Sequence, residues 1–216
     1  MQHWADASNG RFGITLSPRD SHLLMFGGLW PTYVSQAHHG VTPPEFGRPF
    51  VKPEQLSRAH MYSFVLTNNF RTNFAATQHG EVLFRYSIRP HQGDWRQGQA
   101  TRFGWAAANP LMAVAAFGEQ PGRLDRTASF CQIDRPNVLL LALKRAEDGD
   151  GIILRLFEAE GKAVKATVML PLVRIEKAYR TNLVEENQQE LPAAEHDFKV
   201  PLDAFGITTV RIQVPP

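Results

Sequence analysis

The amino-acid sequence predicts an all-β fold whose C-terminal part is a small antiparallel β-sandwich. Short segments in which apolar and polar residues alternate recur along the chain, and this alternation is typical of strands with one buried face. Clusters of glycine, proline, asparagine and aspartate separate these segments and favour turns. No long helical segment intervenes between the C-terminal strands. Several short strands joined by turns are typical of a β-sandwich.

Residues 13–16 and 23–26 are the first predicted strands. Both segments are short and apolar, and residues 17–21 contain a proline and small polar residues that favour a turn. We therefore expect a hairpin. Residues 29–60 follow, with repeated prolines and no sustained period. Loops of this length are uncommon and are usually functional or disordered.

Residues 61–89 form the central stretch of the chain, in which two predicted strands flank a polar segment. In residues 82–88 the apolar side chains alternate with the others, as in a strand with one apolar face. Residues 62–66 are rich in aromatic and branched side chains and form the other predicted strand. The segment between them, which we call the polar island, contains Thr67, Asn68, Asn69, Arg71, Thr72 and Asn73.

The polar island has two interpretations. Asparagine is depleted in strand interiors because its amide competes for backbone hydrogen bonds, so the cluster marks a turn, a bulge or a ligand-facing strand end. A wide turn is one interpretation, since Asn and Thr are ordinary turn residues. In the other, planar amides, a hydroxyl and a guanidinium beside aromatic rings suit the hydroxyl groups of a sugar. The candidate substrate-binding residues are then Asn68, Asn69, Arg71, Thr72 and Asn73.

Residues 90–104 are polar and predict a surface connection. Within it, Trp95 is either a platform for a sugar or a cap on the core, and the cap is the favoured interpretation. Residues 106–117 contain enough alanine for a short helix, with Pro110 near its start. Residues 123–128 are the expected linker between two units.

The C-terminal strands are more sharply patterned. Residues 138–143 are apolar without alternation, which is typical of a strand covered on both faces. The acidic, glycine-containing residues 147–151 favour a turn before residues 152–157, so these segments form a predicted hairpin. Further strands are predicted at residues 164–170, 198–200 and 209–214.

Charge and cysteine content exclude some classes of function. The 216 residues include 23 basic and 21 acidic side chains that are well mixed, so nucleic acid is not an expected partner. The single Cys131 forms no internal disulfide, and its apolar neighbours indicate a buried residue rather than a nucleophile. The N-terminus lacks a signal-peptide pattern, and the longest mostly apolar stretch is too short to span a membrane. We therefore expect a cytoplasmic protein with no membrane partner.

Two features invite a metal interpretation. The adjacent His38 and His39 lie in the long loop, but a zinc site needs three or four converging ligands, and no Cys or carboxylate lies at a familiar spacing. Glu45 and His60 join them only if the loop folds in an unpredicted way. The acidic turn at residues 147–151 lacks the alternating ligands and distal glutamate of a calcium loop. No metal site is therefore predicted in this chain.

Three blocks of sequence occur in a recognisable order. The first contains WADASN at 4–9, GITL at 13–16 and LMFGG at 24–28. The second contains the asparagine pattern at 68–74 and FRYSI at 84–88, and the third is NVLLLALKRAEDGDGIILRLFE at 137–158. Together these blocks resemble the C-terminal β region of the α-mannosidases of glycoside hydrolase family 38.

The resemblance implies both a fold and a role. Residues 1–124 are expected to be the later part of a galactose-mutarotase-like β-supersandwich, and residues 125–216 a complete C-terminal β-sandwich. The family's catalytic barrel, which carries the nucleophile and a zinc ion, has no counterpart in this chain. The resemblance therefore implies a non-catalytic portion, without a cofactor of its own, that packs on the barrel and helps to shape a pocket for a mannoside-type carbohydrate.

The isolated chain is not expected to hydrolyse glycosides. Retaining hydrolysis needs two carboxyl groups about 5 Å apart on a rigid frame, and the candidate carboxylates here lie in turns or beside linkers. The alternative is a stand-alone carbohydrate-binding or assembly module without a hydrolase partner. An incomplete sheet leaves unpaired edges, so we also expect either the proline-rich loop to cover an edge or a homo-oligomer to form.

Overall fold

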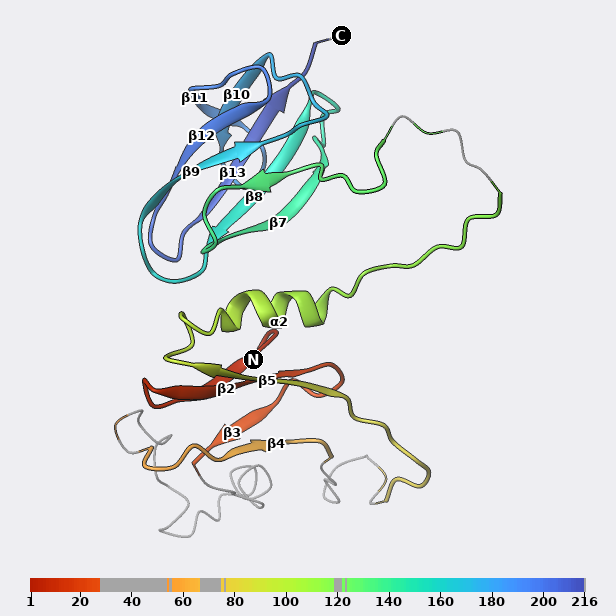
Figure 1. The fold of residues 1–216 in the computed structure, drawn as a ribbon, viewed down its shortest axis with the longest axis vertical. Helices are drawn as coiled ribbons and strands as arrows, with labels where there is room; N and C mark the ends of the chain where they lie inside the picture. Colours follow the sequence, from red (N-terminus) through yellow and green to blue (C-terminus); the bar gives the residue numbers. More distant parts are fainter. Residues whose placement is uncertain are drawn as a thin grey trace. The chain divides into compact units, whose positions relative to one another are not determined.

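The computed structural model describes residues 1–27, 54, 56–66, 75, 77–118, 122 and 124–215. These residues divide into two compact units, Met1–Ala113 and Val114–Pro216 (Figure 1). Antiparallel sheets dominate both units, so the all-β prediction is confirmed. The expected domain boundary between residues 124 and 125 and the galactose-mutarotase-like topology stay predictions. The helices in the described part of the chain are too short or too polar to cross a membrane.

The first unit contains a three-stranded sheet in the order β1-β2-β5 and a two-stranded sheet. The strands of the larger sheet are β1 (Ala5–Ser8), β2 (Phe12–Pro18) and β5 (Tyr86–Gln92). The smaller sheet pairs β3 (Leu24–Phe26) with β4 (Met61–Ser63). Helix α2 (Ala100–Ala108) lies on one side of the larger sheet, and the smaller sheet lies on the other (Figure 1).

The predicted hairpin between residues 13–16 and 23–26 is wrong. β2 pairs with β1 on one side and β5 on the other, while β3 pairs with β4. The tight turn lies earlier, because the Asn9 side chain accepts hydrogen bonds from the backbone N–H groups of Arg11 and Phe12 at 3.0 and 3.1 Å. Gly10 completes that turn with a φ of 83°, which suits a residue without a Cβ.

The central strands are shorter or shifted relative to the prediction. β4 covers only the start of the predicted 62–66 strand, and β5 begins at Tyr86 rather than at residue 82. The Arg85 backbone N–H donates to the Asp20 carboxylate at 2.7 Å instead of joining the sheet. Pairing therefore starts at Tyr86, opposite Pro18 at the end of β2.

The helix predicted at residues 106–117 is displaced. α2 ends at Ala108, and both the backbone and the side-chain amide of Asn109 donate to the Trp105 carbonyl at its end. Pro110 follows this end instead of starting the helix, because a residue before proline is disfavoured in helical geometry. Gly104 allows α2 to approach Trp4 closely, since a Cβ at this position would lie 2.6 Å from the Trp4 Cβ.

The second unit is a β-sandwich of a five-stranded and a three-stranded sheet. The larger sheet, in the order β11-β10-β13-β8-β7, consists of β7 (Val138–Arg145), β8 (Ile152–Glu158), β10 (Lys177–Thr181), β11 (Asn187–Leu191) and β13 (Ile207–Gln213). The smaller sheet, in the order β12-β9-β6, consists of β6 (Gln132–Ile133), β9 (Val164–Met169) and β12 (Asp197–Leu202).

A single hydrophobic core fills the space between these two sheets. The larger sheet contributes Leu154, Leu156, Val210 and Ile212, and the smaller one contributes Val168, Phe198 and Val200, all of which are fully buried. The predicted hairpin of residues 138–157 and the predicted strands at 164–170, 198–200 and 209–214 are confirmed. β7, however, is an edge strand with an exposed Leu143, so it is not covered on both faces as predicted.

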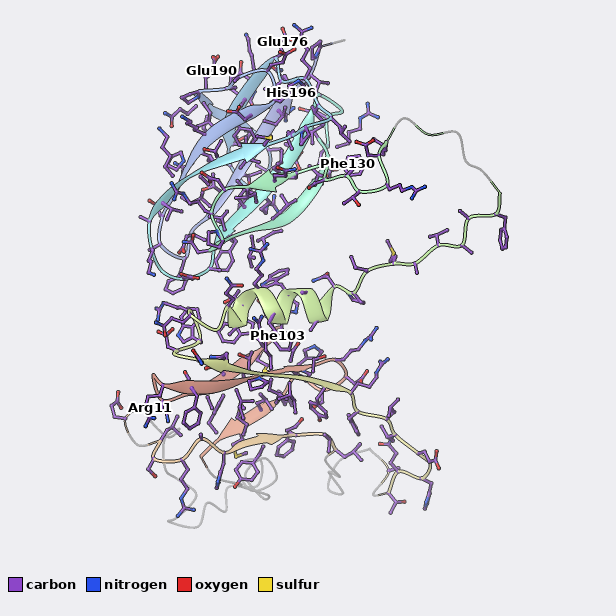
Figure 2. The ribbon with its side chains drawn as sticks, in the orientation of Figure 1. Arg11, Phe103, Phe130, Glu176, Glu190 and His196 are labelled. Atoms are coloured by element: carbon purple, nitrogen blue, oxygen red, sulfur yellow. The ribbon has the colours of Figure 1, made fainter. Side chains whose placement is uncertain are left out.

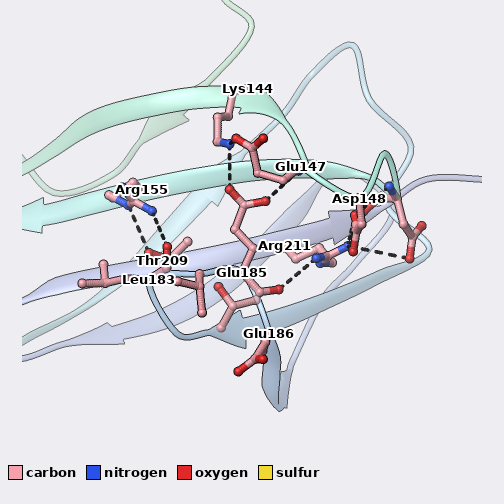
Figure 3. A network of polar contacts seen from close by, with 12 residues as sticks. Lys144, Glu147, Asp148, Arg155, Leu183, Glu185, Glu186, Thr209 and Arg211 are labelled. Atoms are coloured by element: carbon pink, nitrogen blue, oxygen red, sulfur yellow. Dashed lines mark hydrogen bonds and ion pairs between the residues drawn. The ribbon is translucent and has the colours of Figure 1, made fainter.

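Ion pairs hold the acidic turn between β7 and β8 (Figure 3). Lys144 pairs with Glu147 and, at 2.7 Å, with Glu185. The buried Arg211 donates to the Asp148 carboxylate at 2.9 Å and to the Glu185 carbonyl at 2.8 Å. The acidic side chains of the turn are therefore used in ion pairs that hold the sandwich together.

Candidate functional site

The polar island lies outside the described residues, as do His38, His39 and Glu45. The predicted sugar contacts of Asn68, Asn69, Arg71, Thr72 and Asn73 therefore stay a prediction. The strands that flank it in the sequence, β4 and β5, are described, and we call them the frame.

Two side-chain contacts hold this frame together. The hydroxyl groups of Ser63 on β4 and Tyr86 on β5 lie 2.8 Å apart and share a hydrogen bond. Next to β5, the Arg85 guanidinium donates to both carboxylate oxygens of Asp20, at 3.0 and 2.6 Å. Hydrogen bonds from Arg85 lower the pKa of Asp20 to about 2, so this pair stays charged at neutral pH. These contacts tie β4 to β5 and β5 to the segment that follows β2.

Trp95 packs against another tryptophan. The Trp95 ring centroid lies 5.6 Å from that of Trp4, and the Arg96 guanidinium carbon lies 4.1 Å from the Trp95 ring centroid. Asp94, beside it, accepts hydrogen bonds from the backbone N–H groups of Arg96 and Gln97 at 3.0 Å each. These contacts support the interpretation of Trp95 as a cap and give Asp94 the role of closing a turn.

A buried ionic pair joins the two outer strands of the larger sheet in the first unit. His91 Nε2 on β5 lies 2.7 Å from Asp6 Oδ2 on β1, and both side chains are only 4% exposed. Thr15, on β2 between them, donates its hydroxyl to the same oxygen at 2.7 Å. The pair therefore ties all three strands together on one face of the sheet.

The His91 ring is held in a narrow slot between glycines. A Cβ added at Gly13 would lie 2.6 Å from the ring, and one at Gly98 would lie 2.4 Å from it. Burial alone lowers the pKa of His91, but its hydrogen bonds to Asp6 and to the Gln92 carbonyl outweigh burial and raise that pKa. Both ring nitrogens face acceptors, which suits the protonated imidazolium.

A polar pocket of about 630 Å³ lies beside this histidine. Its lining comes from the β1–β2 turn, the end of β5 and the turn before α2, namely Gly10, Arg11, Arg89, Pro90, His91, Gln92, Gly93, Gln97 and Gly98. The sequence interpretation assigned residues 90–104 to a surface connection and missed this pocket. The available signal was the cluster of His91, Gln92 and Gly93 at the end of an alternating strand.

Other sequence candidates have structural roles. Cys131 is half-buried against the core of the second unit, and burial raises the pKa of its thiol, which disfavours a nucleophilic thiolate. In the described part of the chain, no three His, Cys, Asp or Glu side chains converge as metal ligands.

Part of the second unit is similar to a known protein family. Residues 137–210 match the family model described as the glycosyl hydrolases family 38 C-terminal beta sandwich domain. The chain is 24% identical over 139 residues to alpha-mannosidase G of Dictyostelium discoideum, a match that covers 61% of this chain and 12% of that protein.

A solved structure shares the fold. A protein in the glycosyl hydrolase family 38 from Enterococcus faecalis superposes with a TM-score of 0.58 at 14% identity, covering 98% of this chain and 22% of that one. The chain thus spans a small part of the length of both proteins. The resemblance drawn from the three sequence blocks is confirmed: residues 137–210 are similar to the C-terminal β-sandwich domain of glycosyl hydrolase family 38.

Proposed function

We propose that this chain is the non-catalytic C-terminal β portion of an α-mannosidase-like glycoside hydrolase. In this role it packs on the catalytic part of the enzyme and helps to shape a pocket for a mannoside-type carbohydrate. The family match of residues 137–210 supports the first part of the proposal. The packing rests on one structural observation in the first unit, an apolar sheet face that the described residues leave incompletely covered.

The larger sheet of the first unit presents opposite chemistry on its two faces. Asp6, Thr15, Ser17 and His91 lie on one face. There Asp6 bonds to Thr15 and His91, and the Ser17 hydroxyl donates to the His3 carbonyl at 2.7 Å. Directly paired residues share a face, so the pairing of Ile14 with Pro90 and of Leu16 with Ile88 places these four on the other face. This second face, with Phe12, is the apolar face.

The apolar face is substantially open to solvent. Phe12 is 61%, Ile14 45% and Ile88 64% exposed. The β4 segment covers the face only in part, because a hollow of about 550 Å³ separates Ile14 and Ile88 from Met61 and Tyr62. Exposed apolar surface of this kind marks an interaction site more often than an isolated exposed residue does.

A second exposed apolar stretch follows α2. Leu111, Met112 and Val114 are each more than four-fifths exposed. They lie in irregular chain that forms no strand. Both surfaces call for a partner with apolar side chains. Since the chain spans only 12% and 22% of its two relatives, the remaining part of such an enzyme is the partner we propose.

The test is association with the catalytic part. The α-mannosidase-type segment expected to be encoded upstream is produced as a separate polypeptide, and the chain is tested for co-elution with it. Turnover of an aryl α-mannoside is measured for the chain, for the segment and for their complex. The wild-type chain should co-elute with that segment, and only the complex should turn over the substrate. The double variant Ile14→Asn/Ile88→Asn should weaken the complex by at least about tenfold, because it places amides in an apolar contact.

The matched control is Val184→Asn, which changes a residue that is 74% exposed in the second unit and lies outside the apolar face. This variant should co-elute as the wild type does. The packing proposal is wrong if the wild-type chain fails to co-elute, or if the double variant remains folded and associates normally. If no catalytic segment is encoded upstream, the stand-alone carbohydrate-binding or assembly module becomes the better hypothesis.

A further inference from the structure

The polar pocket beside His91 carries an excess of positive charge. Arg11 and Arg89 both line it, and none of its lining residues is an aspartate or a glutamate. The buried His91 adds little to the net charge, because Asp6 faces it at 2.7 Å. Two guanidinium groups therefore set the electrostatic character of the pocket.

Neither guanidinium is neutralised by a described carboxylate. Arg11 has an exposed side chain at the edge of the first unit (Figure 2), and no ion pair is formed by it within the described ranges. The guanidinium carbon of Arg89 lies 5.9 Å from the centroid of the Phe103 ring, a contact that orients the side chain without cancelling its charge. By contrast, Arg85 and Arg211 are each paired with an aspartate.

Gln97 adds a fixed donor to the same pocket. Its side-chain oxygen accepts from the Asp94 backbone N–H at 3.2 Å, which leaves the amide NH₂ group as the free end. The side chain packs directly over Gly93, where a Cβ would lie 1.7 Å from the Gln97 oxygen. Gly93 has a φ of 70°, a conformation that favours glycine.

We infer that this pocket binds a small oxyanion, such as the carboxylate or phosphate group of an acidic ligand. Guanidinium groups donate paired hydrogen bonds to both kinds of group, and the Gln97 amide supplies a further donor. The pocket has room for a ligand larger than the anion alone. All of these residues lie in the first unit, so the site is independent of the proposed function.

The test measures binding to the folded chain at low ionic strength, where screening is weak. The probes are inorganic phosphate, D-glucuronate and uncharged D-glucose, each followed by calorimetry and by the NMR signals of the Gln97 side-chain amide. We expect phosphate or glucuronate to bind with a Kd below about 10 mM, and we expect glucose to leave the Gln97 amide signals unchanged. The stronger of the two anions distinguishes a phosphate-bearing from a carboxylate-bearing ligand.

The double variant Arg11→Gln/Arg89→Gln should reduce anion affinity by at least about tenfold. Arg58→Gln is the control, because Arg58 is exposed in the same unit and does not line the pocket. Thermal unfolding verifies that both variants fold. Arg89→Lys, which keeps the charge but loses the paired donors, should bind more weakly than the wild type and more tightly than the double variant. Absence of anion binding by the wild type, or equal losses in the double variant and the control, would overturn the inference.

Discussion

The backbone N–H of Phe205 donates a hydrogen bond of 3.0 Å to the carboxylate of Glu158, across 47 positions of sequence. Phe205 holds a φ of 53°, in the left-handed region that non-glycine residues rarely occupy. The same carboxylate accepts from the Asn137 side chain at 2.7 Å and from the backbone N–H groups of Glu160, Gly161 and Lys162. Glu158 is fully buried, so one carboxylate organises three separate loop segments of the sandwich.

Replacing Glu158 with glutamine should destabilise the second unit. The new amide places an NH₂ group where the carboxylate accepted hydrogen bonds, so buried N–H donors lose their partner. We expect the free energy of unfolding to fall by at least about 2 kcal/mol in urea titration. Glu190→Gln, at an exposed position of β11, is the control and should have little effect. Equal stability of the two variants would contradict this role for Glu158.

The same residue predicts an acid-sensitive stability. Burial alone raises the pKa of Glu158, but hydrogen bonds from Phe205, Glu160 and Asn137 outweigh burial and hold that pKa below its ordinary value of 4.5. The resulting stability is present above pH 4.5 and is lost as the pH falls through the lower pKa of the folded state. Unfolding free energies of the wild type and Glu158→Gln, measured between pH 7 and pH 3, should therefore converge toward the acid end. Parallel curves would exclude this contribution.

The Asp6–His91 pair predicts the opposite pH dependence for the first unit. Burial and the charge of Arg89 lower the folded-state pKa of His91, but the hydrogen bonds to Asp6 and to the Gln92 carbonyl outweigh them and raise it above its ordinary value of 6.5. Its stabilising effect is thus present below pH 6.5 and is lost as the pH rises through the folded-state pKa. Thermal unfolding should show this loss in the wild type and in the exposed His22→Gln control, but not in His91→Gln. A wild-type profile that is flat above pH 6.5 would contradict the prediction.

Two arginine ion pairs, one buried and one exposed, should contribute differently to the free energy of unfolding. Arg211 is 5% exposed and donates to Asp148, to the Asp150 carbonyl and to the buried Glu185 carbonyl. Arg211→Ala therefore removes three hydrogen bonds and leaves the buried Glu185 carbonyl without this donor. We expect a loss of about 2 kcal/mol or more in the free energy of unfolding. Arg174 pairs with Glu195 at 3.5 Å with both side chains exposed, so Arg174→Ala should cost under about 0.5 kcal/mol. Urea unfolding of both variants measures the difference.

Local sequence patterns predicted the second unit better than the first. The hairpin of residues 138–157 and the strand at 164–170 depend on alternation and turn residues that lie next to one another in the chain. The sheet of the first unit instead contains the Asp6–His91 contact between β1 and β5, across 85 positions, and Asn9, whose side chain closes the β1–β2 turn. The local alternation of apolar and polar residues carries no information about such distant polar contacts. The predicted hairpin of residues 13–16 and 23–26 is wrong for this reason.

The polar pocket was missed for a related reason. Arg11, Arg89 and Gln97 come from three turns or strand ends, and no two of them are neighbours in a motif. The pocket exists only because β2 and β5 pair and α2 folds back beside them. The polar island, in contrast, is recognised from its composition alone. An experiment is needed to decide between its two interpretations.

That experiment separates the two interpretations of the island by replacing Asn69, Arg71 and Asn73 individually with alanine in the assembled hydrolase. If these side chains contact the sugar, each variant loses hydrogen bonds of about 0.5 to 1.5 kcal/mol for neutral pairs and more for Arg71. We expect kcat/KM for an aryl α-mannoside to fall while Tm stays near the wild-type value. Ser63→Ala, which removes the hydroxyl bonded to Tyr86 in the frame, is the structural control. It should lower Tm and leave kcat/KM near the wild-type value. A loss of Tm with normal kinetics at all three island positions would show that the island is a turn, and the sugar-contact assignment would be abandoned.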